Sequence, residues 1–217
     1  MKKVIKIILM VLIIGIILFI ITGCGKEKEV IVENTIIEEE LSKTEENSEE
    51  ESLLGNWNND TYENENLGLK FNLPEEWVYS TEEDVVKMMN IDTEYLEDEK
   101  EFLEEMSKLN TAYYMVANNP NTGDSVTILT EKLAKEVTEE KFLNQLKNDL
   151  EYNMSYNVGE VLKEKISGIE FKTLTITTSN EVTQKYYVCK KDEHFVCIIA
   201  TSTSGENNIN TIMKAFK

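Results

Sequence analysis

The chain has 217 residues and a formal net charge of −19, from 41 acidic and 22 basic side chains. Residues 53–217 alone hold 30 acidic residues and 16 lysines, so the part expected to fold is acidic in its own right. Because an acidic domain is not attracted to phosphate backbones, the composition excludes nucleic acid as a partner. A folded part of about 165 residues is the size of one ordinary domain and can bury a core without disulfide bonds.

The first 23 residues follow the pattern of a secretory signal peptide. Three lysines in the first six positions precede an apolar run over residues 7–21, and Gly23 stands just before Cys24. A positive start, an apolar centre and a small residue at the cleavage position are typical of such signals. The run is shorter than the roughly 20 residues that a transmembrane helix needs. We therefore expect residues 1–23 to be removed, with an uncleaved signal anchor and an ordinary secreted protein as the alternatives.

The end of this segment, Ile21-Thr22-Gly23-Cys24, resembles a bacterial lipobox. In lipobox proteins the cysteine sulfur receives a diacylglycerol, and the chain is cut directly before that cysteine. The resemblance implies that Cys24 is the lipidated first residue of the mature protein. The acyl chains would hold the protein to the cell membrane with its domain on the extracytoplasmic face, since several chains anchor more firmly than one.

Residues 24–55 are expected to be the lipidated cysteine followed by a disordered acidic linker. Glutamates cluster at positions 38–40, 45–46 and 49–51, among serine, threonine, asparagine and lysine. Such a charged segment with few aromatic residues cannot offset the entropy cost of ordering. We interpret it as a spacer with a reach of about 30 Å. An interaction tail for a cationic partner is the alternative.

The folded domain is predicted to occupy residues 56–217 and to begin with a strand and two helices. Apolar residues alternate over 67–73, which indicates a strand. Ser80 and Glu83 have the spacing of a capping box at the start of a helix. A second helix is expected over 95–109, with a thin apolar face.

The rest of the domain is predicted to be a hairpin, a helix, a meander of strands and a last helix. Strands at 111–117 and 125–129 enclose a turn-rich segment, and Thr138 is the N-cap of the following helix. The later elements are strands at 158–166, 169–177, 182–189 and 195–201 and an amphipathic helix at 209–216. Because strands joined by tight turns are antiparallel, the pattern predicts an α+β fold with an antiparallel sheet covered by helices.

A short motif near the start of the domain resembles the opening of PsbP-like domains, whose fold is shared with the Ran-binding protein Mog1. The order of elements is similar over most of 60–217. The motif reads Tyr62-x-Asn64 and then Leu67-Gly68-Leu69-x-Phe71-x-Leu73-Pro74-x-x-Trp77. The resemblance implies an α/β/α sandwich and a non-catalytic accessory or assembly role. The basic docking surface of the plant protein has no counterpart in this acidic chain, and the family's metal sites cannot be carried over.

No motif for catalysis, cofactor binding or metal binding is found in the sequence, so we predict none of these sites. The single histidine, His194, lies in a predicted hairpin turn between Cys189 and Cys197. If these two cysteines lie directly opposite each other, they face the same side and form a disulfide. If the register differs by one residue, they face opposite sides and the disulfide is excluded.

Two sets of aromatic residues are candidate binding surfaces. Trp57 and Trp77 line a sugar or peptide groove or, alternatively, pack in the core. The adjacent pairs 113–114 and 186–187 are tyrosines on strands, where one ring of each pair faces solvent or a helix layer. We therefore predict a non-enzymatic accessory or binding protein that acts through protein contacts in the cell envelope. A small-ligand or glycan-binding lipoprotein with an aromatic-lined cleft is the alternative, and a hydrolase is the least favoured.

Overall fold

The structure is a computed structural model that describes residues 54–91, 99–132 and 137–217. Cys24, the signal peptide predicted at 1–23 and nearly all of the linker predicted at 24–55 lie outside the described residues. Within the described ranges, no helix is both long enough and apolar enough to cross a membrane.

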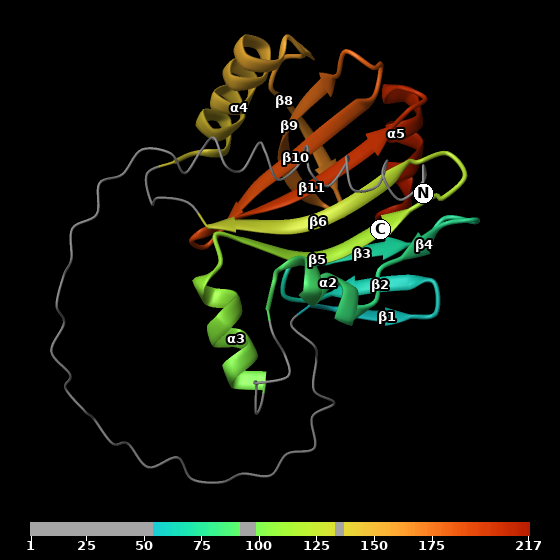
Figure 1. The fold of residues 1–217 in the computed structure, drawn as a ribbon, viewed down its shortest axis with the longest axis vertical. Helices are drawn as coiled ribbons and strands as arrows, with labels where there is room; N and C mark the ends of the chain where they lie inside the picture. The colour runs from blue at the N-terminus through green and yellow to red at the C-terminus, as the bar shows by residue number, and fades with distance from the viewer. Residues whose placement is uncertain (1–53, 92–98, 133–136) are drawn as a thin grey trace, which may run out of the picture. The chain divides into compact units, whose positions relative to one another are not determined.

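The domain contains two antiparallel sheets (Figure 1). The smaller sheet has the strand order β1-β2-β3, and the larger sheet has the order β4-β5-β6-β11-β10-β9-β7, with β8 also paired to β9. The strands of the small sheet are β1 (Asn56–Asn58), β2 (Thr61–Asn64) and β3 (Leu69–Asn72). Those of the large sheet are β4 (Val78–Tyr79), β5 (Thr111–Asn118), β6 (Ser125–Lys132), β7 (Asn157–Val158), β8 (Leu162–Ile166), β9 (Ile169–Thr177), β10 (Thr183–Lys191) and β11 (His194–Ser202).

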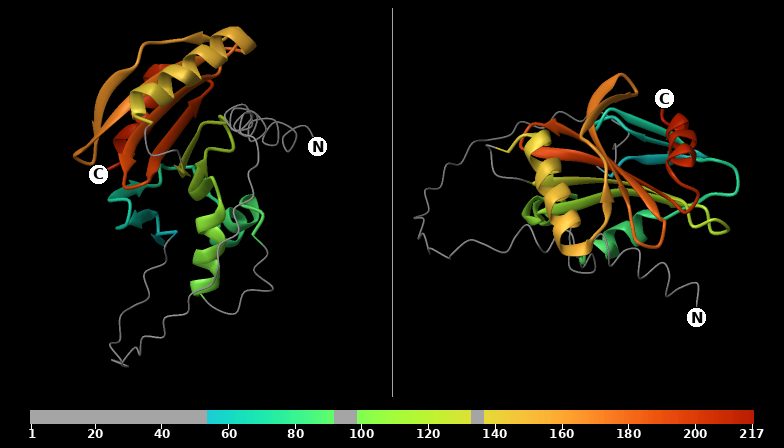
Figure 2. Two further views of the ribbon diagram at one scale, coloured as in Figure 1. Left: turned by 90° about the vertical axis from the view of Figure 1, so that its left-hand side faces the viewer. Right: turned by 90° about the horizontal axis from the view of Figure 1, so that it is seen from above.

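Two helices cover opposite faces of the large sheet. Phe142 in α4 (Glu139–Met154) contacts the ring of Phe195, with centroids 5.4 Å apart. Ile209 in α5 (Glu206–Ile212) packs in the same cluster as Val196. Because adjacent residues of a strand point to opposite faces, α4 and α5 lie on opposite sides of β11. Figure 2 shows α4 lying across β9 and β10 in two further views.

The small sheet shares one face of the large sheet with α5. Tyr62, Leu69 and Phe71 belong to the same buried cluster as Met115 and Ile198 of the large sheet. The α+β class with an antiparallel sheet is therefore confirmed. On this face the small sheet lies in the same layer as α5, an addition to the helical layers that were predicted.

The C-terminus closes the open side of β3. The short 3-10 helix η2 (Met213–Ala215) follows α5, and Phe216 is extended and pairs with Phe71. The two phenylalanine rings lie 4.9 Å apart, and the Lys217 N–H donates to the Lys70 carbonyl. The last helix therefore ends before residue 216, because the final apolar side chain packs on β3 instead.

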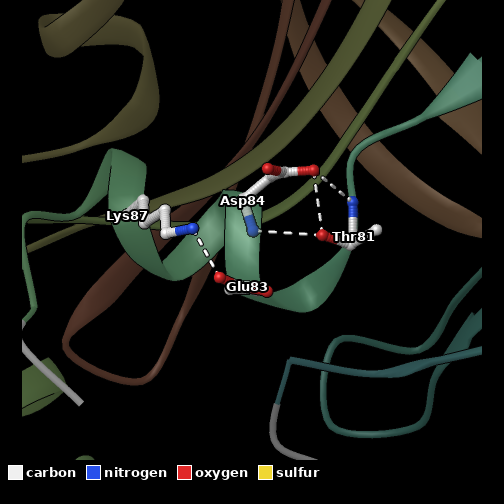
Figure 3. A network of polar contacts seen from close by, with 4 residues as sticks. All are labelled: Thr81, Glu83, Asp84 and Lys87. Atoms are coloured by element: carbon white, nitrogen blue, oxygen red, sulfur yellow. Dashed lines mark hydrogen bonds and ion pairs between the residues drawn. The ribbon is translucent and has the colours of Figure 1, made fainter. Parts of the chain in front are cut away.

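The N-cap of α2 (Glu82–Met88) lies one residue after the predicted one (Figure 3). Thr81 Oγ1 accepts from the Asp84 N–H, and the Asp84 carboxylate accepts from the Thr81 N–H, both at 3.2 Å. Ser80 instead donates its N–H to the Val116 carbonyl at 2.9 Å. The prediction of Ser80 with Glu83 was wrong because the pairing of β4 with β5 takes Ser80 into the strand ladder.

Other elements agree with the sequence to different degrees. Thr138 caps α4 as predicted, accepting from the Lys141 N–H at 3.2 Å. The strand predicted at 158–166 is two strands, β7 and β8, which both pair with β9 but in registers that differ by one residue. Helix α3 (Glu99–Lys108) lies within the range predicted for it, and residues 92–98 lie outside the described residues. Strands β1, β2 and β4 were not predicted.

Candidate functional site

A stacked pair of aromatic rings joins the edges of the two sheets. Trp57 is the central residue of β1, the outer strand of the small sheet, and Tyr79 ends β4, the outer strand of the large sheet. Their ring centroids are 4.0 Å apart with an angle of 13° between the planes. Tyr62 packs against Trp57 in a tilted arrangement at 5.5 Å. Contacts between aromatic rings stabilise a structure by more than the burial of their apolar area alone. These two contacts therefore hold the edges of the two sheets together.

The β4 side of this pair is exposed. Tyr79 has 39% of its surface accessible, and Val78 beside it has 50%. Trp57 is half-buried against the core. Because Val78 and Tyr79 point to opposite faces of their strand, large apolar surface is exposed on both sides of this edge. Exposed adjacent apolar residues on an edge strand are the kind of feature that marks an interaction site.

The main chain of β4 also has unused pairing capacity. Ser80 faces β5, because its N–H donates to the Val116 carbonyl. Along an antiparallel strand the hydrogen-bonding direction alternates, so the N–H and C=O of Tyr79 point away from β5. Within the part of the chain that the structure describes, β4 pairs with β5 alone. The edge at Tyr79 is therefore able to accept another strand.

Carboxylates flank β4 on both sides in the sequence and are all exposed: Glu75, Glu76, Glu82, Glu83 and Asp84. Residues 75–84 contain no lysine. Lys87 pairs with Glu83, and hydrogen bonds from the Thr81 side chain and backbone lower the pKa of Asp84 (Figure 3). Among the described residues, no ion pair is found for the other three carboxylates. The segments that precede and follow β4 in the sequence are thus strongly acidic and exposed.

The tyrosine pairs named from the sequence do not form this surface. Tyr186 and Tyr187 are both buried, because β10 is an inner strand covered on both faces. Of the two environments predicted for these rings, a helix layer or solvent, solvent is therefore excluded, and this pair offers no open binding surface. Tyr113 and Tyr114 are half-buried, and Trp77 packs against the core. Of the aromatic residues considered from the sequence, Trp57 is the one that reaches the candidate site.

The two cysteines of the domain are not joined. In the pairing of β10 with β11, Cys189 lies opposite Val196, and Cys197 lies opposite Val188. This register differs by one residue from the one that a disulfide needs, so the thiols face opposite sides of the sheet. Both cysteines are free. The disulfide considered for Cys189 and Cys197 is excluded by this geometry.

Neither thiol has the environment of an activated nucleophile. Burial, and then the charge of Glu139, raise the pKa of Cys189 to about 11. Burial also raises the pKa of Cys197 well above its ordinary value. A reactive cysteine requires the opposite shift. His194 is half-buried at the start of β11, in register with Lys191.

Sequence reasoning did not find the buried charged residues, of which Lys185 and Glu131 are two. Lys185 in β10 is 3% exposed and pairs with Glu164 at 2.7 Å and Glu206 at 3.1 Å. Glu131 in β6 is also buried, and its carboxylate accepts from the Thr111 hydroxyl at 2.9 Å. Burial raises the pKa of Glu131 to about 7. The period-two pattern places Lys185 on the strand predicted at 182–189, whereas Glu131 lies beyond the strand predicted at 125–129, and the pattern does not distinguish a buried charge from an exposed one.

Within the described ranges, no group of three or more histidine, cysteine, aspartate or glutamate side chains is placed to hold a metal ion. No protein-family model matches the sequence. No curated protein sequence matches it either.

Among solved structures, the chain is similar to the solution structure of the cyanobacterial PsbP protein (CyanoP) from Synechocystis sp. PCC 6803. The similarity covers 72% of this chain and 90% of the other, with 9% sequence identity and a TM-score of 0.42. A likeness of this degree concerns the course of the chain, and no residue role or activity follows from it.

Proposed function

We propose that this protein is a lipid-anchored accessory protein of the cell envelope that acts by binding another protein and catalyses no reaction. The observation that carries the proposal is the edge formed by Val78 and Tyr79, with Trp57 stacked behind it. The lipobox-like ending at Cys24 supports the location, because it matches the pattern of a lipidated extracytoplasmic protein.

The composition of the edge favours a protein partner. Tyrosine and tryptophan are enriched among the residues that dominate binding energy at protein interfaces. An outer strand with an unpaired N–H and C=O accepts an extended segment by adding it to the sheet. Tyr79 combines both properties, since its side chain is partly exposed beside Trp57 and its main-chain groups point away from β5.

A glycan-binding site is less well supported by the same geometry. A sugar ring binds by stacking on an open aromatic face, and the Trp57 ring is in contact with Tyr79 on one side and with Tyr62 at a tilt. The sugar would have to bind on Tyr79 alone. The pair is better suited to hold an edge in place for a protein partner.

The anchor and the linker would give this edge its range of action. A flexible chain of the length of residues 24–55 reaches about 30 Å. The domain would therefore sample a thin layer next to the membrane, where tethering raises its effective concentration toward other membrane-attached proteins.

Site-specific photo-cross-linking in intact cells tests the binding proposal. A photoreactive amino acid replaces Tyr79 in one strain and Tyr152, an exposed residue of α4, in a control strain. We expect a discrete cross-linked protein band from position 79 that is missing from position 152. Identical band patterns from both positions, or no band from position 79, would refute the proposal.

The anchor is tested separately with Cys24→Ala. Cells are fed an alkyne-bearing fatty acid, and the mature protein is analysed by mass spectrometry and detergent phase partition. We expect the unchanged protein to be labelled and to begin at Cys24, and the variant to be unlabelled and to keep residues 1–23. A variant of the same size that is held equally firmly in the membrane would overturn the predicted location.

A further inference from the structure

We infer that the partner presents an extended segment rich in lysine or arginine, which adds as a strand to the open edge of β4. This inference rests on the proposed function and specifies the chemistry of the partner. It follows from three features of the edge: its main-chain groups, its exposed ring and the sign of the charge around it.

The main chain of β4 gives the binding mode but little of the affinity. Tyr79 is the one residue of β4 whose N–H and C=O point to the open side. One residue supplies one donor and one acceptor, which is a weak attachment for a peptide on its own. Side-chain contacts and charge must therefore supply most of the affinity and all of the selectivity.

The charge around β4 is of one sign and is largely uncompensated. Residues 75–84 carry five carboxylates and no lysine, and one of these carboxylates is paired with Lys87. The exposed ring of Tyr79 lies between the two groups of carboxylates in the sequence. Cations bind well over an aromatic face that is close to carboxylates. The cation of a lysine or arginine side chain can interact with the tyrosine ring and with the carboxylates at the same time.

The opposite end of the large sheet shows that this charge imbalance is not general. Strands β7 and β8 run along the outer side of β9, and residues 157–166 contain two glutamates and two lysines. Both glutamates and one of the lysines are in ion pairs: Glu160 with Lys147, Glu164 with Lys185 and Lys163 with Glu170. One end of the sheet is neutralised by its own residues, whereas the β4 end is left negative.

The same charge argues against other occupants of the edge. A second copy of the chain paired through β4 would bring two sets of five carboxylates together. The chain's own linker is also unsuitable, because residues 25–52 contain 11 glutamates and three lysines. An anionic lipid surface is repelled for the same reason. A cationic protein segment is the occupant that fits.

Binding of labelled synthetic peptides, followed by fluorescence anisotropy, tests the inference. The probe is a nine-residue peptide in which lysine alternates with threonine and valine. Three analogues carry serine in place of lysine, glutamate in place of lysine, or proline at alternate positions. We expect the lysine peptide alone to bind, with an affinity that falls about 10-fold or more as salt rises from 50 to 300 mM.

Matched charge variants locate the binding site. The triple variant Glu75→Gln, Glu76→Gln and Glu82→Gln removes three charges beside β4. The control is a triple variant with the same substitution at positions 104, 151 and 181, which are exposed glutamates elsewhere. We expect a loss of about 10-fold in affinity from the first and less than 2-fold from the second. Circular dichroism checks that both remain folded.

Each other outcome contradicts a stated part of the inference. Equal binding of the serine or glutamate peptide, or equal loss in both triple variants, overturns the role of charge. Equal binding of the proline peptide overturns strand addition. If no peptide binds while position 79 still cross-links to a protein in cells, the cationic-strand inference is wrong and the proposed function stands. If the cross-link also fails, both are wrong.

Discussion

A buried carboxyl group, that of Glu131, should make the stability of this domain depend on pH near neutrality. Glu131 is 6% exposed, and burial raises its pKa from an ordinary value of 4.5 to about 7. The hydrogen bond from the Thr111 hydroxyl opposes this shift without cancelling it. Burial, and then the charge of Glu131, raise the pKa values of the half-buried Tyr113 and the buried Cys197.

The direction of the effect follows from proton binding in the two states. Below pH 4.5 the carboxyl group is protonated in both the folded and the unfolded protein. Between pH 4.5 and about 7 the unfolded chain releases the proton and the folded protein keeps it, so stability falls as pH rises. Above pH 7 the folded protein ionises too, and the loss is complete. The difference between these pKa values corresponds to about 3 kcal/mol.

The substitution Glu131→Gln removes this titration and keeps the size of the side chain and its carbonyl acceptor. Urea unfolding of both proteins is measured at intervals from pH 4.5 to 8. We expect the variant to gain about 3 kcal/mol relative to the unchanged protein across this range. The pKa values of Asp84 and Glu170 are lowered, and their effects cancel in the comparison. A stability difference that stays constant with pH would refute the reasoning.

Three further perturbations test other parts of the structure. Gly55→Ala should destabilise more than Gly123→Ala, since both have φ near +80° but only at Gly55 would a Cβ lie 2.6 Å from a carbonyl oxygen; equal melting temperatures would contradict this. Lys185→Met should cost about 1–3 kcal/mol in urea unfolding, because it keeps the buried stem and removes the cation from between two partly exposed glutamates; unchanged stability would show that the ion pairs contribute nothing. The thiols of Cys189 and Cys197 should react slowly with a disulfide reagent in the folded domain and rapidly in urea; no reaction in urea would reveal a disulfide.

The elements that the sequence predicted well are those whose signal is local. Thr138 is followed by acidic residues and a regular apolar stripe, and no other element competes for it, so α4 begins where expected. At α2 the same kind of signal predicted an N-cap at Ser80, one residue before the observed N-cap. Ser80 and Thr81 both have an acidic residue three positions later, and pairing with a strand more than 30 residues away decides between them.

Two strands of the small sheet, β1 and β2, escaped prediction because they are short and polar. β1 is Asn-Trp-Asn, and in β2 the buried positions are Tyr62 and Asn64. A buried asparagine breaks the apolar alternation that identifies a strand. In the structure its amide is satisfied, because Asn64 Nδ2 donates to Tyr62 Oη and Asn64 Oδ1 accepts from the Leu67 N–H. These hydrogen bonds form only in the folded chain, so a local sequence pattern does not predict that Asn64 is buried.

The pairing of Trp57 with Tyr79 at the candidate site was missed for a related reason. Trp57 and Tyr79 are far apart in the sequence and lie on outer strands of different sheets, so their stacking depends on how the two sheets pack. The sequence named Trp57 together with Trp77 and the tyrosines of β5 and β10, and on β10 alternation correctly placed the two rings on opposite faces. It could not indicate that β10 is an inner strand with both faces covered.

The carboxylates around β4 have to be understood together with the edge that they surround. Natural sheets often place charged side chains on an outer strand to prevent pairing with other chains. In this domain the charges precede and follow the strand, and the strand itself carries Val78 and Tyr79. A strand with charges at its ends and apolar residues at its centre still repels a second copy of the same acidic chain. A segment of opposite charge would not be repelled, so under the proposed binding mode one arrangement would limit self-association and also select the partner.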